Sequence, residues 1–325
     1  MNVKNKKKEK KIRKPIKQQI KETFHYIRIH PMLYVMLIPG LVLLAIFEFL
    51  PYYGITMAFK DYNIFAADNP LKSIAASEWV GLEQFRKLFG SSQFLKVLKN
   101  TIVLNGLRIL VLFPIPIIVA ILLREARNKK LANFTQTIIY VPYFFSWTII
   151  NGVFVSLLGS YGMINTLIVK LGGERIGFFS DPYVFRGVLL FTDGWKSVGY
   201  NVILYMAALV AISPELYEAA RIDGANKYQE ILHITFPCIL PTIVMTLILR
   251  VGNLLTKGFE QVLVFYNPSV YETSDIIGTY IYRIGIGKMD FSRSAAMGLF
   301  NSVVSAILVI STNYISKKLV KRSLW

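Results

Sequence analysis

Six apolar segments constrain this chain more than any other feature of its sequence, because each is long enough to cross a lipid bilayer. A bilayer core of about 30 Å requires roughly 20 apolar residues in a helix, which satisfies its own backbone hydrogen bonds. The sequence therefore predicts an all-α integral membrane protein with six transmembrane helices, multi-pass in the cell membrane. The segments cover approximately residues 33–57, 101–123, 134–158, 187–212, 236–256 and 295–316.

The polar stretches between these segments leave little room for other domains. The chain has 325 residues, and 54% of them are hydrophobic. The two longer polar loops, 58–100 and 257–294, are too short for independent domains. We therefore predict one transmembrane domain over 33–316, flanked by a basic tail over 1–32 and a short tail over 317–325.

The distribution of positive charge predicts the orientation. The formal net charge is +18. Of the 37 Lys and Arg residues, 21 lie in the tails and in the two loops on the same side as the tails, against 13 in the opposite loops. Basic loops stay in the cytoplasm, so we expect both termini and the polar insert at 213–235 to be cytoplasmic. The basic tail lacks the interleaved aromatic residues that stack bases, which argues against nucleic-acid binding.

The polar insert is too charged to cross a bilayer, although apolar segments flank it on both sides. Ser213 is a helix-capping residue, and Pro214 suits the first helical position. Gly224 readily takes the positive φ that ends a helix. A second short helix is expected over 226–234, ending before Pro237. The pattern predicts a helix–turn–helix that either contacts another protein or is a solvated loop.

The spacing within the insert resembles the EAA motif of ABC importer permeases. That motif reads E-A-A-x3-G-x9-I-x-L-P, and the chain matches it with one departure, Phe236 in place of leucine. The resemblance implies a type I ABC importer permease fold, in which this loop is the coupling helix that sits in a groove of a cytoplasmic ATPase subunit. The ATPase-coupling residues that it implies are Glu218, Ala219, Ala220, Asp223, Gly224 and Ala225.

The same resemblance implies that the chain works as one part of a larger machine. It lacks the pattern G-x-x-x-x-G-K-[ST] that cradles ATP phosphates, since "GIGKMD" at 285–290 has neither the upstream glycine nor the hydroxyl residue. We therefore expect no catalysis and no cofactor bound by this chain, with ATP and Mg used by a separate ATPase. The implied partners are two cytoplasmic ATPase subunits, a second homologous permease and an extracellular solute-binding protein. Transport would follow alternating access, with lipid around the helices.

Two further stretches resemble sugar permeases of the maltose-transporter type. "WVGLEQFRKLF" at 79–89 resembles the external segment before the second span, and Trp79 with Phe85 predicts an amphipathic helix at the outer interface. "GFEQVLVFYNPSVYETSDIIGTYIYR" at 258–283 resembles permeases for complex polysaccharide or oligosaccharide fragments. That stretch either contacts the substrate or its binding protein, or is an ordered external loop without ligand contact.

Sugars require aromatic faces for stacking and polar groups for their hydroxyls, and the predicted spans hold both. Aromatic residues in spans also pack helices, and asparagine also joins helices by hydrogen bonds. Both interpretations therefore stay open for each residue. The uncharged substrate-path candidates are Tyr143, Phe144, Trp147, Trp195, Tyr200, Asn201 and Asn253.

Charged residues within spans are more informative, because they usually face the bundle interior or a cavity. Asp193 and Lys196 are three residues apart, share a helix face and are predicted to pair. Arg108, Lys196 and Arg250 complete the substrate-path candidates. Internal ion pairs that hold the bundle together are the plain alternative. The rival function is an ion-coupled secondary transporter that uses these charges as a relay, but it predicts inverted internal repeats, and we find none.

The balance of these charges favours an acidic substrate. The three cations face two acids, Asp193 and Glu48, which leaves one cation without an obvious partner. A buried unpaired charge is costly, and the planar arginine fork matches a carboxylate. The resemblance to permeases for complex oligosaccharides implies substrates that include plant cell-wall fragments rich in uronic acids. Together with the charge balance, it suggests an acidic oligosaccharide, such as a pectin-derived fragment, contacted by Arg108 or Arg250. In the alternative, the odd cation reaches a lipid headgroup or pairs with the sibling permease.

Overall fold

The computed structural model describes residues 25–319, which excludes most of both predicted tails. The described residues divide into two compact units between Thr56 and Met57. The described part is almost entirely helical, with one two-stranded sheet. Its elements up to the second apolar segment are α2 (Pro31–Leu44), η1 (Ala45–Phe49), η2 (Leu50–Phe59), β1 (Lys60–Asp61), α3 (Pro70–Ala76), β2 (Glu78–Trp79), α4 (Glu83–Phe89), α5 (Ser92–Leu107), η3 (Arg108–Leu112) and α6 (Pro114–Glu125).

The elements after α6 carry the remaining apolar segments. They are α7 (Lys129–Tyr140), η4 (Val141–Phe144), α8 (Trp147–Leu158), α9 (Met163–Lys170), α10 (Pro182–Val210), α11 (Pro214–Ile222), α12 (Lys227–Glu230), η5 (Ile231–Thr235), α13 (Phe236–Gly252), α14 (Phe259–Phe265), η6 (Pro268–Val270), α15 (Tyr271–Ser274), α16 (Ile277–Tyr282), η7 (Arg283–Gly287) and α17 (Phe291–Leu319).

Apolar length agrees with a multi-pass membrane fold. Within residues 25–319, five helical runs are long and apolar enough to cross a membrane, and α10 with α11, bent by 66°, makes a sixth when the pair is taken as one span. The first run, Pro31–Phe59, contains Glu48.

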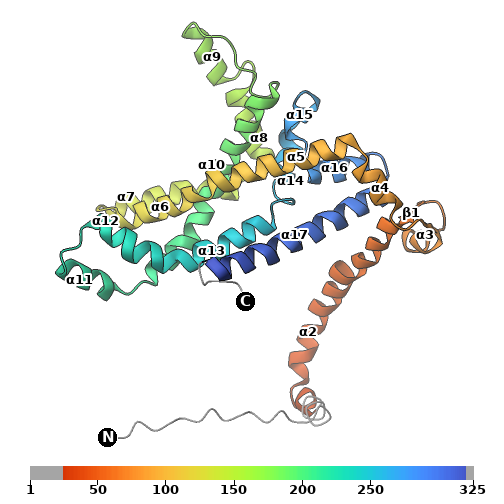
Figure 1. The fold of residues 1–325 in the computed structure, drawn as a ribbon, viewed down its shortest axis with the longest axis horizontal. Helices are drawn as coiled ribbons and strands as arrows, with labels where there is room; N and C mark the ends of the chain where they lie inside the picture. Colours follow the sequence, from red (N-terminus) through yellow and green to blue (C-terminus); the bar gives the residue numbers. More distant parts are fainter. Residues whose placement is uncertain (1–24, 320–325) are drawn as a thin grey trace. The chain divides into compact units, whose positions relative to one another are not determined.

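Long helices of the second unit form a bundle. α6, α10, α13 and α17 run beside one another in Figure 1. Their buried apolar side chains form a cluster that includes Ile117, Val202 and Ile239, from α6, α10 and α13. Two further clusters join α5 to α8, α10 and α14, and join α4 and α5 to α16 and α17. The spans are therefore held by contacts between segments that are distant in sequence.

The predicted third span, 134–158, is broken in the structure. α7 ends in the 3-10 turn of η4, Phe145 takes an extended conformation, and Ser146 caps α8 by accepting a hydrogen bond from Ile149 N at 3.3 Å. Pro142 has no N–H to continue an α-helix, which explains the break. The continuous apolar run is instead Trp147–Lys170, formed by α8 and α9.

The segment before the second span also differs from expectation. Trp79 lies in β2, which pairs with β1, and its ring stacks on Phe59 at 5.5 Å. Phe85 contacts the same Phe59 ring from α4, and Leu88 is fully buried. The predicted single amphipathic helix over 79–89 is thus a strand followed by a short helix, because Gly81 turns the chain with φ +60°.

Candidate functional site

The insert at 213–235 has the helix–turn–helix that its sequence predicts. Pro214 begins α11, and Ser213 caps it by accepting a hydrogen bond from Glu215 N at 3.3 Å. Asn226 caps α12 in a capping box with Gln229. The two helices are therefore specified by residues at their own ends.

Gly224 forms the turn between the two helices with φ +81°. Its N–H donates to Arg221 O at 3.1 Å, and Ala225 N donates to Ala220 O at 2.9 Å. This pair of bonds is a Schellman motif, which requires a left-handed residue at the position of Gly224. The predicted end of the first helix is correct in position and in mechanism.

The second helix of the insert differs from the prediction in one respect. It does not end before Pro237 but continues through the π-helical turn η5 into α13, so that Lys227–Gly252 is one helical run. The π-helical turn widens the backbone just before the proline, whose missing N–H would otherwise leave a gap in the hydrogen-bond ladder. The insert is thus continuous with the fifth apolar segment.

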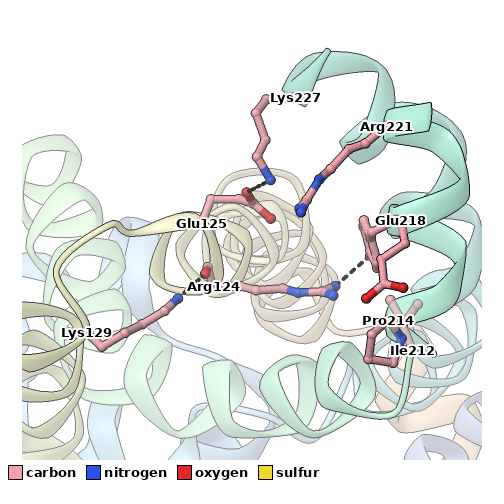
Figure 2. A pocket seen from close by; sticks show the side chains of 9 residues that line it. Arg124, Glu125, Lys129, Ile212, Pro214, Glu218, Arg221 and Lys227 are labelled. Atoms are coloured by element: carbon pink, nitrogen blue, oxygen red, sulfur yellow. Dashed lines mark hydrogen bonds and ion pairs between the residues drawn. The ribbon is translucent and has the colours of Figure 1, made fainter. Parts of the chain in front are cut away.

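The motif residues of the insert lie at two adjacent hollows. Glu218 lines a cavity of about 370 Å³ with Arg124 and Lys129, from α6 and α7. Figure 2 shows Lys227 of the insert reaching Glu125 at the end of α6. Ala220, Asp223, Gly224 and Ala225 line a second cavity of about 270 Å³. Apart from the half-buried Ala220 and Ala225, the motif residues are exposed, so the motif presents a charged, accessible surface.

A buried polar cluster lies on the opposite part of the bundle. We call Asn105, Arg108, Asp193, Lys257 and Gln261 the Arg108 cluster. The Arg108 side chain is 2% exposed, and its Nε faces Asp193 Oδ2 at 3.2 Å in an ion pair. Its terminal nitrogens donate to Asn105 Oδ1 at 2.6 Å and to Gln261 Oε1. The two terminal nitrogens of Arg108 are therefore hydrogen-bonded within the chain, while its Nε makes the ion pair with Asp193 but no hydrogen bond.

The turn after α13 completes this cluster. Lys257 Nζ lies 3.7 Å from Asp193 Oδ2, and Asn105 Nδ2 donates to Leu254 O at 2.7 Å. Gly258 has φ +95°, and a Cβ there would collide with the Arg108 guanidinium. The guanidinium thus packs on bare backbone, which only glycine allows at this position.

Lys196 does not form the predicted pair with Asp193. Its Nζ donates to Tyr143 O at 2.9 Å and also to Phe145 O. These two carbonyls lie at the break between α7 and α8. Irregular backbone within a bilayer must find internal partners, and Lys196 supplies them, while Asp193 pairs with Arg108 instead.

Aromatic rings gather around the same break. Tyr143 and Tyr200 stack with centroids 4.2 Å apart, and the Lys196 ammonium lies 5.3 Å from the ring centre of Trp147. Trp147 also lines a cavity of about 370 Å³ with Asp193, Lys257 and Glu260. This arrangement places aromatic faces beside cationic groups and one open hollow.

The segment 266–283 is built around an ion pair. Asp275 is fully buried and receives two hydrogen bonds from the Arg283 guanidinium, which also lies over the rings of Tyr271 and Tyr280. Burial lowers the pKa of Arg283, but the bonds to Asp275 outweigh it and hold this pKa above its usual range. Burial also raises the pKa of Tyr266 to about 12. These contacts fix the fold of the segment.

Residues 112–322 match the family described as "Binding-protein-dependent transport system inner membrane component". The chain belongs to this family. It is a multi-pass membrane component of an ABC transporter, and the family is a transport permease and not an enzyme. The predicted resemblance to ABC importer permeases and the predicted all-α membrane fold are confirmed.

Individual relatives align with most of the length of this chain. Protein LplB of Bacillus subtilis is 44% identical over 287 residues, which is 88% of each chain. The polygalacturonan/rhamnogalacturonan transport system permease protein YteP of the same organism is 42% identical over the same shares. A permease chain in the crystal structure of a bacterial alginate ABC transporter, in complex with an alginate pentasaccharide-bound periplasmic protein, has a TM-score of 0.83 and 37% identity. That match covers 93% of this chain and 99% of the other.

The structure separates the predicted substrate-path residues of the permease into distinct surroundings. Tyr143, Trp147, Lys196 and Tyr200 meet at the break. Arg250 lies near Asp193, with its guanidinium 5.7 Å from the ring centre of Phe113. Phe144 lies beside them, with its ring centre 5.9 Å from that of Tyr143, but it is 81% exposed. The others do not join this group: Trp195 lines an apolar hollow with Phe191, and Asn201 and Asn253 donate to carbonyls of their own helices.

Sequence reasoning missed Lys257, Glu260 and Gln261. They fall at the start of what we predicted as an outer loop, yet the turn between α13 and α14 brings them against the second and fourth apolar segments. The sequence did contain a signal for this turn: two polar residues, Thr256 and Lys257, lie at the end of the fifth apolar segment, directly before Gly258. Among the described residues, no group of three or more His, Cys, Asp or Glu could hold a metal ion.

Proposed function

We propose that this permease subunit takes up complex, acidic oligosaccharides in an ATP-driven importer that works by alternating access. YteP is named for polygalacturonan and rhamnogalacturonan transport, and the similar solved structure is an alginate transporter. Both names point to chains rich in uronic acids. The full machine would contain a second homologous permease, two ATPase subunits and an extracellular solute-binding protein, with both termini of this chain in the cytoplasm.

The observation that carries the acidic substrate is the charge around the hollow lined by Trp147, Asp193 and Lys257. Four cations lie on or near it, Arg108, Lys196, Arg250 and Lys257, against the two acids Asp193 and Glu260. An excess of positive charge in a membrane interior favours an anion. We assign contact with a sugar carboxylate to Arg250 and Lys257.

Arg108 has a different proposed role from the one that its sequence suggested. Its guanidinium is buried, is hydrogen-bonded to Asn105 and Gln261, and forms an ion pair with Asp193. We propose that Arg108 instead holds in place the turn that carries Lys257. We assign sugar stacking to the ring of Trp147, which lines the hollow with Lys257, and to the ring of Tyr200, which lies beside Tyr143 at the break.

Uptake competition tests the substrate class. The complete importer in proteoliposomes is given neutral and uronic-acid oligosaccharides of equal length, with wild type, Arg250→Gln, Lys257→Gln and the exposed control Lys170→Gln. In wild type, we expect an acidic oligosaccharide to inhibit uptake at a concentration at least tenfold lower than a neutral one. Arg250→Gln and Lys257→Gln should each reduce this preference at least threefold. The binding protein is the same throughout, so a difference between variants belongs to the permease. Equal competition by neutral sugars in every variant contradicts the proposal.

We also propose that the insert is the surface that receives the ATPase, through Glu218, Ala219, Ala220, Asp223, Gly224 and Ala225. Glu218 is exposed at the larger hollow and offers a negative charge to a basic partner. Glu218→Lys should keep the protein in the membrane while reducing transport per ATP hydrolysed at least fivefold. Glu215→Lys, an exposed change on the same helix, is the matched control. Wild-type coupling in Glu218→Lys at normal expression removes this role.

A further inference from the structure

Tyr217 of the insert faces inward, unlike the residues on either side of it. Tyr217 is 6% exposed, whereas Leu216 and Glu218 on either side are exposed. Its ring belongs to the buried cluster formed by α6, α10 and α13. The coupling motif is therefore anchored by the residue that directly precedes its glutamate.

The hydroxyl of Tyr217 joins two different apolar segments. Arg124 Nη1, at the end of α6, donates to it at 2.7 Å, and the Arg124 guanidinium lies 4.5 Å from the centre of the tyrosine ring. On the other side, the same hydroxyl is 2.9 Å from Thr235 Oγ1, at the last residue before α13. One side chain thus links α11 to the end of the second apolar segment and to the start of the fifth.

A second link between the insert and α6 is more open to solvent. Lys227 Nζ lies 3.0 Å from Glu125 Oε2 and 2.8 Å from Glu230 Oε2, and Figure 2 shows the Lys227 side chain crossing to α6. The Lys227 side chain is 61% exposed, so water and salt screen its pairs. The contact of Tyr217 with Thr235 is buried and its contact with Arg124 is partly buried, so solvent competes less for them than for the pairs of Lys227.

We propose that Tyr217 is the positioning residue that makes α11 move together with the second and fifth apolar segments. This rests on the proposed role of the insert as the ATPase-docking surface. A partner that displaces Glu218 displaces Tyr217 with it, and Tyr217 passes the displacement to α6 through Arg124 and to α13 through Thr235. Without the hydroxyl, the ATPase still binds, but a displacement of α11 moves α6 and α13 less.

The test measures ATP hydrolysed per sugar imported by the complete importer in proteoliposomes. Tyr217→Phe keeps the buried ring and removes both hydroxyl contacts. We expect this variant to hydrolyse at least three times more ATP per sugar imported, while the ATPase co-purifies with it as it does with wild type. Tyr228→Phe is the matched control, because that ring is 71% exposed on the same insert, and its ratio should equal wild type. A purely structural role would lower the amount of folded complex and leave the ratio unchanged.

Two further variants keep the proposal testable if too little Tyr217→Phe permease reaches the membrane to be measured. Thr235→Val removes one hydroxyl partner at nearly constant volume, and Arg124→Gln removes the other. Each should raise the ratio, and Tyr217→Phe combined with Arg124→Gln should be no worse than Tyr217→Phe alone, because they share one bond. A wild-type ratio in Tyr217→Phe and Thr235→Val, or loss of the ATPase in either, overturns the proposal.

The outcome also separates this inference from the proposed function. If Glu218→Lys uncouples transport and Tyr217→Phe does not, the insert receives the ATPase, but Tyr217 does not position it. If neither variant uncouples transport, the insert is not the docking surface at all.

Discussion

The insert and the Arg108 cluster differ in how the chain builds them. The insert draws its caps and its turn from residues within a few positions of one another, from Ser213 to Gln229. The Arg108 cluster joins residues up to 153 positions apart, since Arg108 donates to Gln261. A surface motif can thus be built locally, whereas a polar site inside a membrane bundle needs several helices to supply partners for its charges.

This difference predicts how each region fails. A change in the insert should leave the bundle folded and remove its communication with a partner. A change in the Arg108 cluster should weaken the fold itself, because each buried polar group there depends on groups from other helices. Four experiments test this contrast.

Gly224→Pro should have the largest effect, a loss of uptake of at least tenfold at normal membrane expression. Proline cannot take the positive φ of Gly224, so the Schellman turn is lost. Gly172→Pro is the matched control, because Gly172 has φ +85°, and its N–H also donates one backbone bond, to Val169 O. Equal loss of uptake in both variants would show general damage and not a specific role of the insert.

Arg108→Gln should destabilise the protein by about 3–5 kcal/mol, because it leaves Asp193 in a buried site without its main partner. The measurement is the midpoint of thermal aggregation in detergent. Arg108→Gln with Asp193→Asn should recover part of the loss, since the unpaired acid is then neutral. If Arg108→Gln were as stable as wild type, the Arg108 cluster would not contribute to the stability of the fold.

Tyr200→Leu should raise the KM for sugar roughly 2- to 12-fold with a small effect on stability, since an aromatic stacking contact is worth about 0.5–1.5 kcal/mol. Tyr200 is half exposed beside Tyr143. Tyr314→Leu, an exposed change on α17, is the control. An unchanged KM in Tyr200→Leu would place the sugar elsewhere.

The smallest expected effect is that of a protonophore. Uptake into proteoliposomes with ATP held constant on the ATPase side should persist when the proton gradient is removed, because the charges of the Arg108 cluster pair with one another. An ion-coupled transporter would instead lose uptake under the same conditions. That result would make the cluster a relay and would leave the insert without a function.

The sequence alone was sufficient for the membrane class, for the permease family and for the shape of the insert. Apolar length decides whether a helix crosses a bilayer, and caps and a positive-φ glycine act over a few residues. For this reason, Ser213, Pro214 and Gly224 could be assigned their structural roles from the sequence.

Only the tertiary structure decided which charges pair. Helical spacing favoured Asp193 with Lys196, but Arg108 reaches Asp193 from another helix, and the break after Pro142 exposes carbonyls that bind Lys196. Lys257 joins the same group because the chain turns back at Gly258. In a membrane interior, each charge takes the partner that packing brings nearest, and packing depends on helices that the sequence places about 150 residues apart.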